Sequence, residues 1–170
     1  QLAKAHSLAS VPGLFTEQGS AVGTGVLKIS FGTTVYDPGT DYVTGDDTYT
    51  SFTANTEISS FDITITSTNN SLTGLRDAIN DKDAGVQASI INDGNGYRLL
   101  LTADSGITQS MEITVTDDDN NDSDLTGLSA FTFNSTATHM EQSQAGLDAN
   151  LKVNGLAATA SSNTVTSIIE

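Results

Sequence analysis

The sequence predicts a β-rich α+β fold made of two small antiparallel-sheet subdomains, each with a hairpin and a short capped helix packed on its sheet. Three observations predict this fold. Apolar and polar residues alternate in several short runs, which is the period of half-buried strands. One segment near residue 75 has apolar residues at helical spacing. A pattern in the first half of the chain recurs at its C-terminal end, which indicates two copies of one unit.

Strands are expected first where alternation is clearest. Leu27, Ile29 and Phe31 fall on one side of a run that begins at residue 25, with polar residues between them. The same period recurs in residues 61–66, 85–92, 97–102 and 111–116. Residues 128–134 predict one more strand, and residues 148–163 predict a strand, a glycine turn and a second strand.

A short helix is expected between the second and third of these runs. Leu72, Leu75, Ala78 and Ile79 recur at helical spacing, so they form one apolar face. Ser71 precedes them and can accept a hydrogen bond from a free amide of the first turn. We therefore expect a helix that begins after Ser71 and lies with its apolar face on the sheet.

Two glycine-rich stretches are predicted to be turns rather than phosphate-binding loops. Residues 93–96 (DGNG) separate two strand-like runs and contain residues that tolerate positive φ, as a tight reversal requires. Residues 23–25 (GTG) precede a strand. A phosphate loop follows a strand and opens a helix, so neither stretch has the required context.

The repeat suggests how the chain is divided. LKIS followed by NNSLTGL in the first copy corresponds to LKVN followed by SSNTVTSI in the second, so Thr164, Val165 and Ile168 match Ser71, Leu72 and Leu75. The first copy carries a loop-like insertion at residues 37–60, in which a small hairpin is centred near Gly45. We expect residues 21–140 to form an inserted subdomain, and residues 1–20 plus 141–170 to form the second. A single continuous domain is the alternative, and the second copy is expected to be truncated at Glu170.

Composition excludes several classes of partner. The chain has 170 residues, of which 6 are basic and 21 acidic, for a net charge of −15. Nucleic acid and anionic membranes need clustered Lys and Arg, whereas the cations here are scattered, so neither is an expected partner. There is no cysteine. No apolar run approaches the roughly 20 residues of a membrane span, and the N-terminus lacks the pattern of a cleavable signal peptide.

We expect no catalytic, cofactor or metal site and no enzyme activity. The acidic run Asp117–Asp124 could bind Ca²⁺, but it lacks the glycine and glutamate of an EF-hand loop, so a solvated loop is favoured. His6 and His139 are far apart in sequence, and no motif accompanies either. The aromatic residues in and beside the insertion are expected to serve a small core rather than a binding surface; they are Tyr36, Tyr42, Tyr49 and Phe52.

Four segments resemble one known family. The residues SLTGLRDAIN and GVQASIINDGNGYRLLLTA, within 70–103, resemble the middle region of the flagellar filament cap family, also called hook-associated protein 2. Residues 2–10, 21–31 and 147–170 are similar to it as well. Both repeat copies resemble the hook IN motif of flagellar axial proteins, whose Ile-Asn pair is here Ile79-Asn80.

The resemblance implies a structural role. In that family, terminal helices form a coiled-coil stalk and the middle region forms head domains, so this chain is expected to be a head-domain fragment. The family forms a homo-oligomeric cap at the distal filament tip and guides flagellin into place, which implies an extracellular, flagellar location reached through the flagellar export channel. An adhesin-like module that binds a host surface or glycan, and a different hook or filament protein, remain alternatives.

Overall fold

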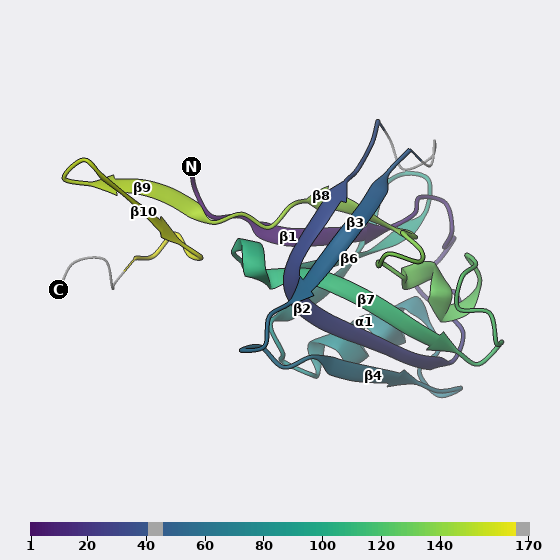
Figure 1. Ribbon diagram of the computed structural model, residues 1–170. Coiled ribbons are helices and arrows are strands. Elements are labelled where there is room, and N and C mark those ends of the chain that lie inside the picture. The colour runs from purple at the N-terminus through teal and green to yellow at the C-terminus, as the bar shows by residue number, and fades with distance from the viewer. Residues whose placement is uncertain (41–45, 166–170) are drawn as a thin grey trace.

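The computed structural model describes residues 1–40 and 46–165, and its architecture is two packed antiparallel sheets with one helix and a projecting hairpin (Figure 1). The first sheet has the strand order β5-β6-β1-β8. Its strands are β1 (Ala5–Ser10), β5 (Val86–Asn92), β6 (Tyr97–Ser105) and β8 (Met140–Gln144). The predicted β-rich α+β class with antiparallel sheets is confirmed.

The second sheet is built around the long strand β2 (Gly25–Asp37). The first part of β2 lies between β4 (Phe61–Ile65) and β7 (Ser110–Asp117), and its last part pairs with β3 (Thr48–Ala54). Because β3 and the end of β2 extend past β7, they form a two-stranded ribbon that crosses the first sheet (Figure 1). The alternation predicted for β2 is confirmed, since Leu27, Ile29 and Phe31 are all buried.

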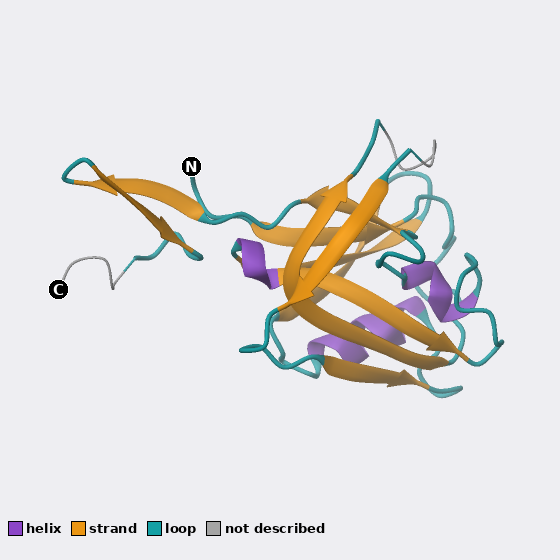
Figure 2. Cartoon of the chain, in the orientation of Figure 1, coloured by secondary structure: helices purple, strands orange, loops and turns teal. Residues whose placement is uncertain are grey.

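The predicted helix is α1 (Leu72–Asn80), and its N-cap is Ser71, whose Oγ accepts a hydrogen bond from the Gly74 amide at 3.0 Å. Leu72, Leu75 and Ile79 are fully buried, as the helical spacing predicts. The other helical turns are the short 3₁₀ segments η1 (Ile107–Gln109) and η2 (Gly127–Phe131) (Figure 2). No helix in the described part of the chain is both long and apolar enough to cross a membrane.

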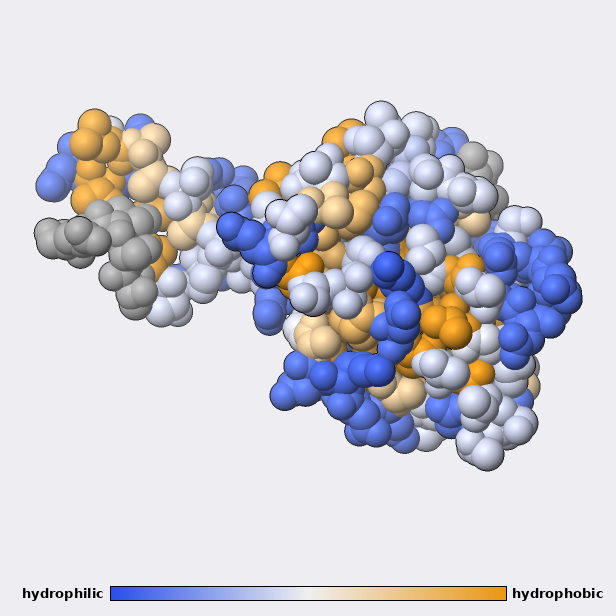
Figure 3. All heavy atoms as spheres, turned by 60° about the horizontal axis from the view of Figure 1, so that its bottom comes forward, coloured by the Kyte–Doolittle hydropathy of each residue, from blue (hydrophilic) through white to orange (hydrophobic). Residues whose placement is uncertain are grey.

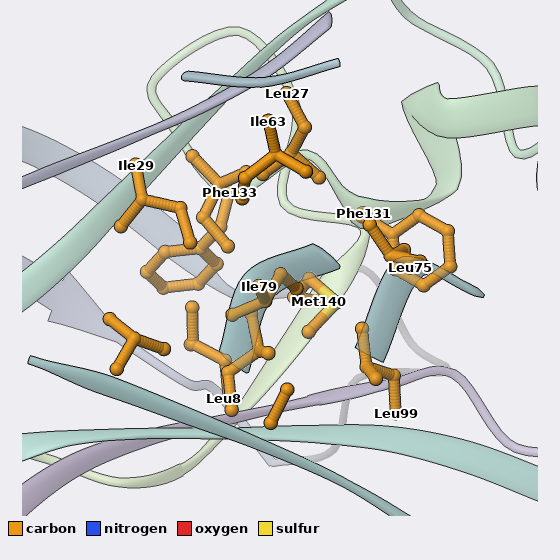
Figure 4. Packing of buried hydrophobic residues seen from close by; sticks show 14 of the residues in the cluster. Leu8, Leu27, Ile29, Ile63, Leu75, Ile79, Leu99, Phe131, Phe133 and Met140 are labelled. Carbon is orange, nitrogen blue, oxygen red and sulfur yellow. The ribbon is translucent and has the colours of Figure 1, made fainter. Parts of the chain in front are cut away.

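One core lies between the two sheets and α1. Side chains from β1, β2, β4, β6, β8, α1 and the segment around η2 meet there (Figure 4). The labelled members are Leu8, Leu27, Ile29, Ile63, Leu75, Ile79, Leu99, Phe131, Phe133 and Met140. Each Å² of apolar surface removed from water contributes about 25 cal/mol. The burial of these side chains is therefore the main stabilising contribution to the fold.

Two sequence predictions are wrong. The insertion 37–60 is not wholly loop-like, because residues 48–54 form β3. Thr50 is an extra residue opposite the Val35–Tyr36 step, and this bulge places Tyr49 and Phe52 on one side, which hides the strand period. Residues 128–134 are not a strand, because η2 and the turn after it bury side chains on all sides. Of the small hairpin predicted near Gly45, the first arm (residues 41–44) lies outside the described residues, and the second (residues 48–50) is part of β3. Most of the second helix predicted after Thr164 also lies outside them.

The predicted subdomain division is only partly visible. β1 and β8, from the two ends of the chain, pair with each other as that division requires. However, β1 also pairs with β6, and Leu8 lies in the common core, so residues 5–10 contact strands assigned to both predicted subdomains. The boundary between the two subdomains stays a prediction.

Candidate interaction surface

A projecting arm lies outside the body formed by the two packed sheets. It consists of residues 1–4 and 147–165 and contains the hairpin of β9 (Ala149–Val153) and β10 (Leu156–Ala160), joined by the tight turn Asn154-Gly155 (Figure 1). The predicted strand, glycine turn and strand are confirmed. Residues 1–4 run antiparallel beside 147–150, with backbone hydrogen bonds between Lys4 and Leu147 at 2.8 and 3.0 Å. The arm therefore has a third, N-terminal segment at its base.

The surface of the arm is apolar for its size. Leu156 is 76% exposed and Leu2 is 71% exposed, the largest values among the large apolar residues of the described chain. Val165 is exposed as well. Figure 3 shows hydrophobic atoms at the far end of the hairpin. One face of the β9–β10 hairpin forms an open hollow of about 500 Å³, lined by residues 150–152 and 157–159.

The charge of the arm differs from that of the body. Of the 21 acidic and 6 basic residues, the arm contains only Asp148, Lys4 and Lys152, so its side chains sum to +1 and those of the remaining chain to −16. A nearly neutral, apolar surface on a strongly acidic protein is the place where another molecule can approach with least repulsion. The arm is therefore the candidate interaction surface, for a further part of the same protein or for another molecule.

The Ile79-Asn80 pair has a defined structural role at the edge of the first sheet. Ile79 is fully buried in the core. Asn80 is the last residue of α1, and its side chain pairs with the backbone of Ala88 in the edge strand β5. Its Nδ2 donates to the Ala88 carbonyl oxygen at 2.9 Å, and its Oδ1 accepts from the Ala88 amide at 2.8 Å. The pair thus anchors the end of the helix and occupies the free edge of β5.

The two histidines are not brought together. His6, on β1, is fully buried: its Nδ1 accepts from the Met111 amide at 3.0 Å, and its Nε2 lies 2.9 Å from Gln142 Oε1. Burial lowers the pKa of His6 to about 4, an effect that the hydrogen bond to Gln142 partly opposes. His139 is half-buried, and its Nδ1 lies 2.8 Å from the Ser129 carbonyl oxygen. Both rings have protein partners, as expected of structural histidines.

Carboxylates of the acidic run Asp117–Asp124 accept hydrogen bonds from backbone amides within the run and just after it. Asp117 is buried rather than solvated, which corrects the expectation at that position, and its Oδ2 accepts from the Ser129 amide at 3.0 Å. Asp122 accepts from the Asp117 amide at 2.6 Å, and Asp124 accepts from the Thr126 amide at 2.8 Å. Within the described residues, no three His, Asp or Glu side chains are grouped so as to hold a metal ion.

The aromatic residues of the β2–β3 ribbon pack inward. The rings of Tyr36 and Tyr49 meet the Phe133 ring edge-on, at centroid distances of 5.0 and 5.4 Å. Burial, together with Asp47, raises the pKa of Tyr36; burial and Glu112 raise that of Tyr49. The expectation that these residues serve a core is confirmed for both tyrosines, and Phe52 is half-buried. Tyr42 lies outside the described residues.

The two glycine-rich stretches are turns. Residues 93–96 reverse the chain between β5 and β6, with Gly94 at φ 91° and Gly96 at φ 152°. Residues 23–25 lead into β2. Neither stretch opens a helix, so both lack the amide arrangement of a phosphate loop.

Sequence reasoning missed the arm as a surface. It identified the hairpin at residues 148–163 but did not predict that Leu2 and Leu156 would be exposed on one projecting unit. A signal was available in the charge distribution, because residues 149–165 contain no acidic residue in a chain with 21 of them.

Comparison with known proteins places these features in a family. The model of the flagellin hook IN motif matches residues 27–105. Flagellar hook-associated protein 2 of Escherichia coli K12 is 44% identical over 105 residues, which are 61% of this chain and 22% of that protein. The B-type flagellar hook-associated protein 2 of Pseudomonas aeruginosa is 36% identical over 118 residues, which are 64% of this chain and 24% of that protein. The chain thus spans less than a quarter of these curated relatives.

Solved structures extend the similarity to the whole chain. The crystal structure of the D2-D3 domains of the flagellar cap protein FliD from Escherichia coli has a TM-score of 0.72 and 33% identity, covering 100% of this chain and 74% of that one. FliD (HAP2) from Pseudomonas aeruginosa has a TM-score of 0.65 and 27% identity, covering 99% of this chain and 66% of that one.

Proposed function

The chain belongs to the flagellar hook-associated protein 2 family, the flagellar cap proteins, and on this premise we propose that it is a head-domain part of a filament cap that acts by contact rather than by catalysis. The partners we propose are further copies of the same protein and flagellin, at the extracellular tip of the filament. The relatives are structural proteins of the flagellum, and they lend no support to the host-surface or glycan partner that the sequence left open.

The proposal rests on the apolar, nearly neutral surface of the arm. Two bodies (residues 5–146) that each hold a side-chain charge of −15 repel each other at short range, although salt screens charges beyond about 8 Å at physiological ionic strength. Close contact is therefore favoured where the surface is apolar and nearly neutral. Leu156 and Leu2 provide such a surface on the arm. The chain spans 74% of the matched D2-D3 structure, so we propose that the arm is a contact surface of this head region, either for the remainder of the same protein or for a neighbouring subunit of the cap.

A chimera tests the cap assignment. The segment of the Escherichia coli hook-associated protein 2 that matches this chain would be replaced by it, and gold-labelled antibody against the chain would be imaged on the flagella. We expect label at the filament tips. Label along the shaft or at the hook would contradict the cap assignment. Chimera that is found in the medium while the tips stay unlabelled would contradict it as well.

Matched variants in the same chimera test the arm. Leu156→Ser removes an exposed leucine of the arm, whereas Leu125→Ser removes one, 46% exposed, from the acidic loop of the body. Because neither residue is buried, both variants should retain the stability of the parent. We expect Leu156→Ser to reduce the fraction of tip-labelled filaments and Leu125→Ser to leave it unchanged. An equal effect of the two substitutions would exclude the arm as the contact.

A further inference from the structure

His6 occupies the junction between the two sheets. It lies on β1 of the first sheet, and the amide that it accepts from belongs to Met111 on β7 of the second. The hydrogen bond therefore joins a strand of one sheet directly to a strand of the other. Its ring also lies 6.0 Å from the ring of Phe133.

The hydrogen bonds around His6 fix its protonation state. An amide N–H can only donate, so Nδ1 must be unprotonated to accept from Met111. Nε2 then carries the proton and donates to Gln142 Oε1. Adding a second proton would place an N–H at Nδ1 against the N–H of Met111, and the bond between the sheets would be lost.

The ladders beside His6 are interrupted on both sides. The pairing of β1 with β6 shifts register between Ala5 and Ser7, and the pairing of β1 with β8 shifts between Ser7 and Leu8. Such irregularities leave fewer regular ladder hydrogen bonds to hold the strand at that point. The bond to Met111 therefore acts where β1 is held least by its neighbours.

Among the described residues, no charged side chain is a hydrogen-bond or ion-pair partner of the His6 ring. Glu112, beside Met111 on β7, accepts from Tyr49 at 3.5 Å, and Glu141, beside Gln142 on β8, pairs with Arg98 at 2.6 Å. β1 itself contains no Lys, Arg, Asp or Glu, and the nearest such residue before it is Lys4. Gln142, which is neutral, is the side-chain partner.

We propose that His6 is an acid-sensitive latch between the two sheets, in which protonation of Nδ1 releases β1 from the Met111 amide. The pKa of His6 is about 4 in the folded chain, against an ordinary value of 6.5. The open or unfolded state therefore binds the proton first as the pH falls. The latch is fully closed above pH 6.5 and is progressively lost between pH 6.5 and 4. From pH 7.5 to pH 5 the closed-to-open ratio should fall about 30-fold.

Two measurements on the unmodified chain test the latch. The ring signals of the two histidines, followed by NMR, should give a pKa near 4 for His6; a pKa near 6.5 would overturn the proposal. Hydrogen exchange, corrected for intrinsic rates, should show the protection of the Met111 amide falling about 30-fold from pH 7.5 to 5. The Ile113 amide, bonded to the Phe133 carbonyl on the same strand, is the internal control. An equal loss at both amides would mean that the whole body opens and that His6 is no latch.

A pair of variants separates His6 from the other titrating groups. His6→Asn cannot be protonated in this pH range, and His139→Asn removes the only other histidine. We expect the Met111 amide to keep its protection at pH 5 in His6→Asn and to lose it in His139→Asn as in the parent. If His6→Asn fails to fold, the NMR titration and the exchange of the parent still decide the question.

Discussion

Replacing Asn80 tests whether the Ile-Asn pair holds α1 to the edge of β5. Its side chain makes two hydrogen bonds to the backbone of Ala88, which lies in the edge strand β5. A hydrogen bond contributes about 0.5–1.5 kcal/mol net, and a buried group left unpaired costs about 1–3 kcal/mol. Since both bonds are only part-buried, we expect Asn80→Ala to lower the free energy of unfolding by about 2–3 kcal/mol.

The assay is urea unfolding followed by far-UV circular dichroism at pH 7. A matched control is Asn95→Ala. Asn95 lies in the exposed 93–96 turn, and its carboxamide makes no hydrogen bond to another described residue. Its substitution should change the free energy of unfolding by less than about 0.5 kcal/mol. If Asn80→Ala cost no more than Asn95→Ala, the pairing with Ala88 would not be what the Ile-Asn pair provides.

Asn80→Asp tests the donor and the acceptor separately. An ionised carboxylate keeps the acceptor for the Ala88 amide, but it places a negative oxygen against the Ala88 carbonyl in place of the Nδ2 donor. We expect the aspartate variant to be at least as destabilised as the alanine variant at pH 7. Protonation restores a donor, so its deficit relative to the parent should shrink at pH 4. A deficit that does not depend on pH would refute the assigned roles.

Three further substitutions have expected outcomes in the same unfolding assay. Ser71→Ala removes the N-cap bond to the Gly74 amide and should cost about 1 kcal/mol. Phe133→Ala removes the fully buried ring on which Tyr36 and Tyr49 pack and should cost about 3–5 kcal/mol, with loss of the near-UV signal of the tyrosines. Gly25→Ala should abolish folding in circular dichroism, because Gly25 has φ 142° and an added Cβ would collide with the backbone carbonyl of β7.

Elements with an undisturbed period could be predicted from the sequence. The first part of β2, up to Phe31, alternates, α1 has helical spacing, and Ser71 marks the start of the helix. Only the first residues of β3 could be predicted, as one arm of the small hairpin near Gly45, because the extra residue Thr50 breaks the period of the strand. The segment of η2 was mistaken for a strand because two phenylalanines two residues apart, Phe131 and Phe133, imitate a strand period. In both cases the order of apolar and polar residues reflects which side chains are buried. Which side chains are buried depends here on neighbours that are distant in sequence.

The candidate surface depends still more on distant neighbours. The repeat predicts that residues 1–20 and 141–170 share a subdomain, but nothing local to residues 1–4 indicates that they pair with 147–150 in particular. Likewise, the partners of His6 lie on β7 and β8, more than 100 residues away. The sequence shows that no catalytic or metal-binding motif accompanies His6. It does not show which residues so distant in sequence contact each other.

The arm and the edge of β5 are secured by the same device. Asn163, which follows β10, accepts from the Ala3 amide at 2.7 Å and donates to the Ala3 carbonyl oxygen at 3.0 Å, as Asn80 does with Ala88. A carboxamide presents one donor and one acceptor side by side, like a peptide group, so it can complete a ladder where no strand is available. Aspartate lacks the donor when it is ionised, which explains why a chain so rich in aspartate has asparagine at both positions. The two carboxamides thus occupy the edge of β5 in the body and fix the base of the arm.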